Sequence, residues 1–183
     1  NGKVTIAYPG GSPDFELSIS RVEGYTSELE NNYGVEITDS IEEVAKNSDA
    51  ILLESVDGSQ HLNQLLEIVS YKKPVFIDKP FSLSVKDADE MIKLSLKHRT
   101  PIMSSSALRF AEGLKNVLNK SDAMGEIIGA DCFGPMDILN EQPGYFWYGI
   151  HSIEMLFTIL GQGVKKVNVV KNEDHDLIIA EWK

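Results

Sequence analysis

The sequence of 183 residues contains a single cysteine, Cys132, so it has no internal disulfide. A lone thiol is typical of a reducing compartment, and we therefore expect a cytoplasmic protein. No apolar run approaches the roughly 20 residues that a membrane-spanning helix needs, and the first residues show no signal-peptide pattern. We expect no membrane partner.

Positive charge is also scarce. The formal net charge is −11, and no basic cluster is larger than the pairs Lys72-Lys73 and Lys165-Lys166. Because contacts to phosphates need a positive surface, this composition argues against binding of nucleic acids. The four histidines and the cysteine lack the spacing of metal ligands, so we predict no metal site. The chain also lacks a Gly-x-Ser-x-Gly nucleophile turn and a G-x-G-x-x-G phosphate-binding turn.

The first part of the sequence alternates short apolar runs with amphipathic segments, which predicts an α/β fold with a parallel sheet. The predicted strands are residues 4–7, 50–53, 75–77 and 101–103. Helical patterns occupy residues 19–32, a short segment capped by Ser40, residues 62–69, and a segment capped by Ser84. In this last helix the predicted buried face is Val85, Ala88, Ile92 and Leu96.

After Ser106 the pattern changes. We predict helices at residues 111–120 and 149–160, a turn within residues 125–130 that leads into a strand, and strands at residues 167–170 and 177–180. The predicted domains are therefore an incomplete Rossmann-like domain over 1–106 and, over 107–183, part of an α+β domain with an open, mainly antiparallel sheet. Because the first strand has no preceding partner and the chain stops straight after a strand, we expect a fragment of a longer protein.

The segment Val75-Phe76-Ile77-Asp78-Lys79-Pro80 is the most informative in the chain. An apolar strand stops at a charged pair and a proline, which places Lys79 at the carboxyl edge of the sheet, where α/β folds bind ligands. Partial burial there lowers the pKa of a lysine and suits it to proton transfer. The alternative is a surface lysine paired with Asp78 at a turn.

His151 is the second candidate. The predicted buried stripe of its helix is Ile150, Ile153, Leu156, Phe157 and Leu160, which leaves His151 on the other side, facing solvent, a cleft or another layer. Imidazole is well matched to proton exchange near neutral pH, although an exposed histidine on a polar face, without a function, is the more common case. Four aromatics, residues 145–148, precede it and serve either as packing or as the wall of a sugar-sized pocket.

The third candidate is the segment 54–61, which follows a buried strand and opens a helix. Main-chain N–H groups at a helix start favour anions. The alternative is that Asp57 and Ser59 simply cap the helix.

These motifs occur in an order that resembles the Gfo/Idh/MocA oxidoreductases. The resemblance is carried by the strand ending in Asp78-Lys79-Pro80, where the family has Glu-Lys-Pro, the preceding strand, loop and histidine-containing helix, Leu108-Arg109-Phe110, and Gly149-Ile150-His151. It extends over nearly the whole chain.

The resemblance implies a Rossmann domain and a substrate domain that often forms oligomers through its sheet, so we expect a homo-oligomer. It implies hydride transfer between NAD or NADP and a hydroxyl-bearing carbon of a sugar or polyol. Lys79 and His151 match the catalytic lysine and histidine, and we expect them to face one cleft. The implied cofactor-binding residues are Tyr8, Ser55, Asp57, His61 and Lys79, and the implied substrate-binding residues are Arg109, Trp147, Tyr148 and His151.

Three features depart from the family pattern. The opening strand and its glycine-rich turn are absent from these 183 residues, Tyr8 follows a strand that normally ends near an acidic residue, and Trp147 replaces an aspartate one turn before the histidine. We therefore expect the 183 residues alone to be inactive. The alternative function is a non-catalytic sugar-binding or assembly module that has kept the fold and lost the cofactor.

Overall fold

A computed structural model describes residues 2–119 and 125–183, which form two compact units. The first unit comprises residues 1–105 and 139–146, and the second comprises residues 106–138 and 147–183. The domain boundary predicted near Ala107 stays a prediction.

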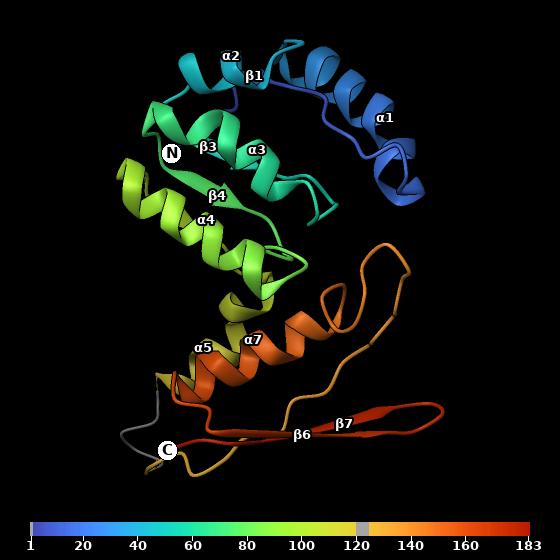
Figure 1. Ribbon diagram of the computed structural model, residues 1–183, viewed down its shortest axis with the longest axis vertical. Helices are drawn as coiled ribbons and strands as arrows, with labels where there is room; N and C mark the ends of the chain where they lie inside the picture. Colours follow the sequence, from blue (N-terminus) through green and yellow to red (C-terminus); the bar gives the residue numbers. More distant parts are fainter. Residues whose placement is uncertain (1, 120–124) are drawn as a thin grey trace. The chain divides into compact units, whose positions relative to one another are not determined.

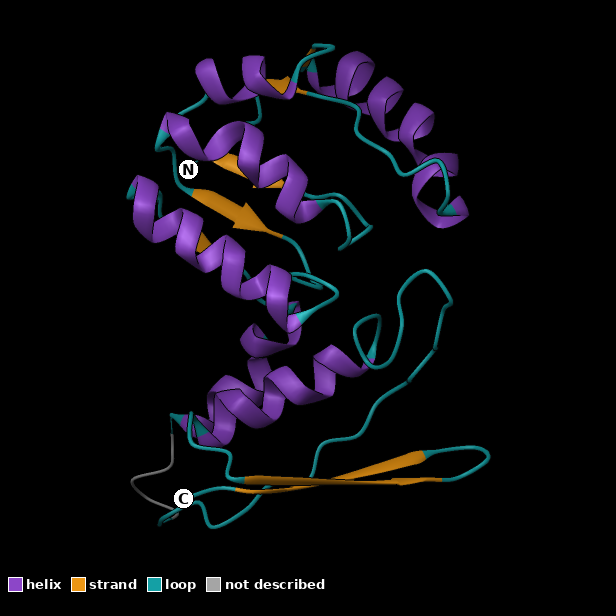
Figure 2. Ribbon diagram, in the orientation of Figure 1, coloured by secondary structure: helices purple, strands orange, loops and turns teal. Residues whose placement is uncertain are grey.

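The first unit contains the four predicted strands and one strand that was not predicted, β2, in two parallel sheets (Figures 1 and 2). In one, β1 (Ile6–Ala7) pairs with β2 (Glu36–Ile37). In the other, β4 (Val75–Ile77) lies between β3 (Ile51–Leu53) and β5 (Ile102–Met103). These parallel strands are joined through helices, so the α/β fold class predicted from the sequence is confirmed.

Local sequence signals set the ends of the helices in this unit. Helix α1 (Glu16–Tyr33) ends at Gly34, whose φ of 63° is the left-handed conformation that glycine adopts without strain. Ser40 and Ser84 cap α2 (Ile41–Lys46) and α4 (Val85–His98) by accepting hydrogen bonds from Glu43 N and Asp87 N. Helix α3 (His61–Ile68) continues into the 3₁₀ turn η1 (Val69–Tyr71).

The hydrophobic core lies between the three-stranded sheet and helices α2, α3 and α4 (Figure 1). Its members come from both strands and helices: Ala45, Ile51, Leu53, Leu65, Ile68, Val69, Val75, Ile77, Met91 and Leu94. Strands β3 and β4 contribute their first and third residues, because alternate side chains point to the same face of a strand.

The predicted buried face of α4 is wrong. Met91 and Leu94 are buried, whereas Val85, Ile92 and Leu96 are exposed. Both sets recur at helical spacing, so hydrophobic periodicity does not distinguish them. The tertiary arrangement decides the rotation of the helix.

The second unit contains the 3₁₀ turn η2 (Ala107–Phe110), α5 (Glu112–Leu118), α7 (Gly149–Leu160) and a hairpin of β6 (Lys166–Lys171) and β7 (Asp176–Glu181). The hairpin is antiparallel, with Lys166 opposite Glu181 and Lys171 opposite Asp176. Helix α7 packs against η2, and its Phe157 ring meets the Trp182 ring edge-on.

Two predictions for this unit are wrong. Residues 125–130 form no strand, and Ile128 is 96% exposed, because no described segment pairs with them. The stripe along α7 is not fully buried either. Its other members are only partly covered and Phe157 is exposed, because a two-stranded hairpin offers little surface to cover a helix.

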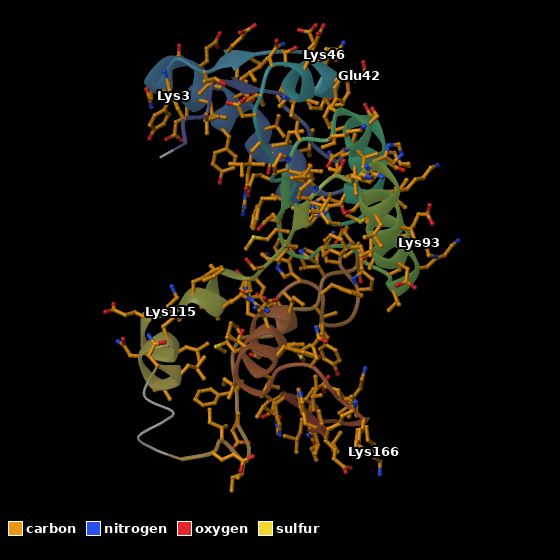
Figure 3. All side chains as sticks on the ribbon, turned by 90° about the vertical axis from the view of Figure 1, so that its left-hand side faces the viewer. Lys3, Glu42, Lys46, Lys93, Lys115 and Lys166 are labelled. Carbon is orange, nitrogen blue, oxygen red and sulfur yellow. The ribbon has the colours of Figure 1, made fainter. Side chains whose placement is uncertain are left out.

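The surface agrees with the scarcity of positive charge in the sequence. The lysines labelled in Figure 3 come from separate elements, including Lys46 on α2, Lys93 on α4 and Lys166 on β6. Within the described residues, no helix combines the length and apolar character that crossing a bilayer requires.

We predict that Leu65→Ala lowers the free energy of unfolding by about 2–5 kcal/mol, because Leu65 is fully buried and its removal leaves a cavity. Leu66 is the matched control, since it is the next residue of α3 and is 50% exposed. Urea denaturation should show a much smaller loss for Leu66→Ala. Equal losses would contradict the placement of the core.

Candidate functional site

The candidate site in the first unit lies where strands β3 and β4 end. The register pairs Leu53 with Ile77, so the two strands finish at the same level. Asp78 N donates a hydrogen bond to Leu53 O at 2.9 Å, so the pairing of β3 with β4 includes Leu53, the last residue of β3. Glu54 and Lys79 therefore begin two loops at one edge of the sheet.

The His61 ring contacts both of these loops. Its side chain is fully buried, with Nε2 2.8 Å from Ser55 O and Nδ1 3.2 Å from Phe81 O. A carbonyl oxygen only accepts and a neutral imidazole carries one N–H group, so the ring donates to one of these carbonyl groups and packs against the other. His61 thus fixes the spacing between the segment with Asp57 and the segment with Lys79, and its predicted contact with a cofactor stays a prediction.

Gly58 allows the same two loops to touch. A methyl group at Gly58 would lie 2.7 Å from Pro80 Cγ and 3.1 Å from Pro80 O. These distances are shorter than ordinary van der Waals contacts, so a side chain at this position would displace Pro80 and with it the neighbouring Lys79.

Asp57 is the centre of the β3 loop. Its Oδ1 atom accepts hydrogen bonds from Ser59 N and from Gln142 Nε2, both at 2.9 Å. Burial alone would raise the pKa of Asp57. The hydrogen bonds from Ser12, Ser59 and Gln142 together lower the pKa by more than burial raises it, so it lies below the ordinary value. Asp57 therefore stays ionised near neutral pH and ties residues 139–146 to the loop.

Lys79 is partly buried, and this burial lowers its pKa, whereas the negative charge of Asp78 acts in the opposite direction. Partial desolvation of the Glu54 carboxyl group, followed by repulsion from Asp78, raises the pKa of Glu54. The edge thus presents an ammonium group that is less well hydrated than one at an open surface. Such a group attracts an oxygen that gains negative charge.

The turn after β1 reaches the same edge through Gln64. A methyl group at Gly10 would lie 3.4 Å from the Tyr8 ring and 3.6 Å from Gln64 Nε2. Gln64 Nε2 in turn donates to Ser55 Oγ at 2.8 Å. The structure therefore brings together Tyr8, Ser55, Asp57, His61 and Lys79, the five predicted cofactor-binding residues, at the carboxyl edge of the first unit's strands.

The second unit holds the other candidates. His151 Nδ1 lies 2.7 Å from Ser106 Oγ, and the His151 ring meets the Tyr148 ring edge-on with centroids 5.6 Å apart. Tyr148 contacts Trp147 in the same manner at 5.8 Å. His151 is therefore held between a buried hydroxyl group and an aromatic edge.

Arg109 pairs with Glu154, one helical turn beyond His151. This pair lies in a concavity of about 420 Å³ lined by Arg109, Ile150, Ile153, Glu154, Phe157, Gly161 and Gln162. Of the predicted substrate-binding residues, Arg109 lines this concavity, whereas Trp147, Tyr148 and His151 are not among its lining residues.

Sequence reasoning missed Gln142 and Ser106. Gln142 is fully buried and reaches Asp57 from 85 positions away, which no local pattern signals. Ser106 had a weak signal, because a serine before a helical turn suggests a cap, and its hydroxyl does accept from Leu108 N. Within the residues that the structure describes, no group of three potential metal ligands occurs.

We predict that Gly58→Ala lowers the free energy of unfolding by about 1–3 kcal/mol, because the new methyl group overlaps Pro80. Gly24 is the control, since a methyl group there meets nothing within 4 Å inside α1. Gly24→Ala should raise stability by about 0.5–1 kcal/mol, as expected for glycine in a helix interior. A loss at both positions, or at neither, in thermal unfolding would contradict this account of the loop contact.

Comparison with known proteins adds independent evidence. Residues 18–105 match the Gfo/Idh/MocA family, described as an oxidoreductase family with an NAD-binding Rossmann fold. Among curated proteins, none is significantly similar in sequence.

Solved structures share the fold at low sequence identity. An NAD-binding protein from Listeria innocua has a TM-score of 0.69 at 18% identity, over 87% of this chain and 51% of its own. A probable dehydrogenase from Thermotoga maritima has a TM-score of 0.68 at 21% identity, over 88% and 56%. The WlbA dehydrogenase from Bordetella pertussis, solved with NADH and UDP-GlcNAcA, has a TM-score of 0.64 at 14% identity, over 100% and 69%.

The chain thus spans about half the length of the first two of these structures. The family description names NAD, in agreement with the predicted nicotinamide cofactor. The match to the Gfo/Idh/MocA family of oxidoreductases covers residues 18–105, which include strands β2 to β5 and the Lys79 edge.

Proposed function

We propose that the whole protein is a cytoplasmic oxidoreductase that moves a hydride between NAD(P) and a hydroxyl-bearing carbon of a sugar, a polyol or a related small molecule. The observation that carries this proposal is the position of Lys79. Strand β4 delivers a partly desolvated ammonium group to the carboxyl edge of a parallel sheet, beside a loop that His61 and Gly58 hold against it.

The residues at this edge fit the ribose and nicotinamide parts of a dinucleotide. Tyr8 is exposed at the end of β1, and in the loop after β3 Ser55 is partly exposed whereas Asp57 is buried. Hydroxyl and carboxylate groups suit the hydroxyl groups of ribose. The bound cofactor would supply the hydride acceptor or donor, while the chain orients it.

The proposed role of Lys79 is electrostatic. Its ammonium group binds the substrate oxygen and stabilises the negative charge that develops there as the hydride moves. Burial removes part of the hydration of the Lys79 ammonium group and so disfavours its charge. A negatively charged alkoxide restores this lost stabilisation more strongly than a neutral hydroxyl group does, so the interaction favours the transition state.

The proposed role of His151 is to interact with the same substrate oxygen and its proton through Nε2. Arg109, Trp147 and Tyr148 would contact the rest of the substrate, since aromatic faces suit sugar rings. The convergence of Lys79 and His151 on one cleft stays a prediction. UDP-GlcNAcA in the WlbA structure supports a sugar-related substrate, and the exposed apolar residues of the β6–β7 hairpin support a homo-oligomer.

We further propose NAD rather than NADP. The turn over residues 8–14 contains no lysine or arginine and includes Asp14. The 2′-phosphate of NADP is usually bound by a basic side chain near this strand end, and nothing in the turn supplies one.

The whole protein should therefore bind NADH at least about tenfold more tightly than NADPH in fluorescence titrations. Tyr8→Arg should narrow this difference and Tyr8→Asp should widen it, because one adds and the other opposes a phosphate contact. Tighter binding of NADPH would contradict the preference. Sugar binding without binding of either cofactor would favour the non-catalytic module.

Lys79→Ala in the whole protein should lower turnover by about 100-fold or more, because the group that stabilises the reacting oxygen is removed. Lys86→Ala is the control, since Lys86 is exposed at the start of α4. Turnover is measured by NADH absorbance with the most active compound from a panel of sugars and polyols. Unchanged turnover in Lys79→Ala would rule out the assigned role.

A further inference from the structure

The hydroxyl group of Ser106 is a buried contact of His151 that the proposed chemistry has not used. Ser106 is fully buried, and its Oγ atom lies 2.7 Å from His151 Nδ1. The same oxygen accepts a hydrogen bond from Leu108 N at 3.1 Å, which closes the first turn of η2. One hydroxyl group thus serves both a main-chain cap and an imidazole ring.

A second pair strengthens the contact between η2 and α7. Arg109 is three residues after Ser106, Glu154 is three residues after His151, and the two side chains form an ion pair. Residues three apart lie on the same face of a helical turn. Two bonded pairs in register therefore fix the rotation of α7 about its axis, and with it the direction in which the His151 ring points.

The hydrogen atoms of this contact can be counted. A serine hydroxyl has one hydrogen to donate and two lone pairs that accept. Leu108 N–H occupies one lone pair. Among the described residues, the only acceptor within hydrogen-bond distance of the Ser106 hydroxyl hydrogen is His151 Nδ1. If Nδ1 carried the proton instead, this buried hydrogen would have no acceptor, which is unfavourable.

We propose that Ser106 is a positioning residue that donates to His151 Nδ1 and thereby keeps the proton of the neutral ring on Nε2. The tautomer is inferred from the hydrogen bonds of the Ser106 hydroxyl group, whereas its catalytic meaning rests on the proposed function. In this tautomer His151 is a hydrogen-bond donor toward the substrate oxygen. It supports a carbonyl or an alkoxide there and does not begin as a proton acceptor.

Acting as a base would require a rearrangement. His151 could accept a proton at Nε2 only after its own proton has moved to Nδ1. The Ser106 oxygen would then accept from Nδ1–H, and its hydroxyl hydrogen would lose its acceptor. Ser106 therefore favours the donor form of the ring over the base form.

The tautomer can be tested by nitrogen NMR of the uniformly ¹⁵N-labelled chain at a pH where the ring is neutral. His151→Gln identifies the signals of His151 among the four histidines. We expect a protonated Nε2 and an unprotonated, hydrogen-bonded Nδ1. A ring with its proton on Nδ1 would overturn the proposal, and this outcome requires no variant of Ser106 to fold.

Variants then test the role of the hydroxyl group. Ser106→Ala should move the Nδ1 resonance toward that of an unbonded imine nitrogen, and Ser106→Thr should restore it. Ser105→Ala is the matched control, because Ser105 is an adjacent buried serine whose hydroxyl is not bonded to His151. An unchanged Nδ1 resonance in Ser106→Ala would also overturn the proposal.

Turnover separates this inference from the proposed function. In an active whole protein, Ser106→Ala should lower kcat by about tenfold or more with little change in KM, because the ring is misaligned while other substrate contacts remain. The expected NMR spectrum in a protein without dehydrogenase activity would refute the proposed function and leave the Ser106 assignment intact. If the whole protein is active and Ser106→Ala leaves kcat unchanged, the positioning role of Ser106 is refuted.

Discussion

The candidate site of the first unit depends on the contacts of the His61 ring with two main-chain carbonyl groups. The loops that follow β3 and β4 contain main-chain carbonyl groups that would be costly to bury without donors. The buried His61 ring faces Ser55 O with Nε2 and Phe81 O with Nδ1, and it donates a hydrogen bond to one of these two carbonyl groups. A neutral ring has one N–H group, and the 2.8 Å contact of Nε2 with Ser55 O is the shorter of the two.

Charge at this edge follows from that arrangement. Holding the loops together brings Glu54, Asp78 and Lys79 to adjoining strand ends, so each charge acts on its neighbours. The pKa of Glu54 rises and the pKa of Lys79 falls, in both cases chiefly because burial disfavours the charged form. Asp57 differs, because donors surround it and keep it ionised. The edge thus combines one stable negative charge with groups whose protonation is easier to change.

Local signals predicted the first unit well and the second less well. The caps at Ser40 and Ser84 and the four predicted apolar strands are short-range features, and the structure confirms them. The rotation of α4 was not predictable, because two apolar stripes with similar spacing compete on that helix. The strand predicted to follow the turn in residues 125–130 does not form. A strand forms only when it pairs with another strand, and the local sequence does not show whether a partner exists.

The contacts that sequence could not reveal are also those that shape the candidate sites. Gln142 Nε2 must face Asp57, since a carboxylate accepts and does not donate, and this bond holds residues 139–146 against a loop 85 positions earlier. Ser106 and His151 are 45 positions apart, as are Arg109 and Glu154. A single polar side chain that meets another across such a separation leaves no periodic trace in composition or spacing. It nevertheless decides the direction of a hydrogen bond, and therefore whether a functional group gives or accepts a proton.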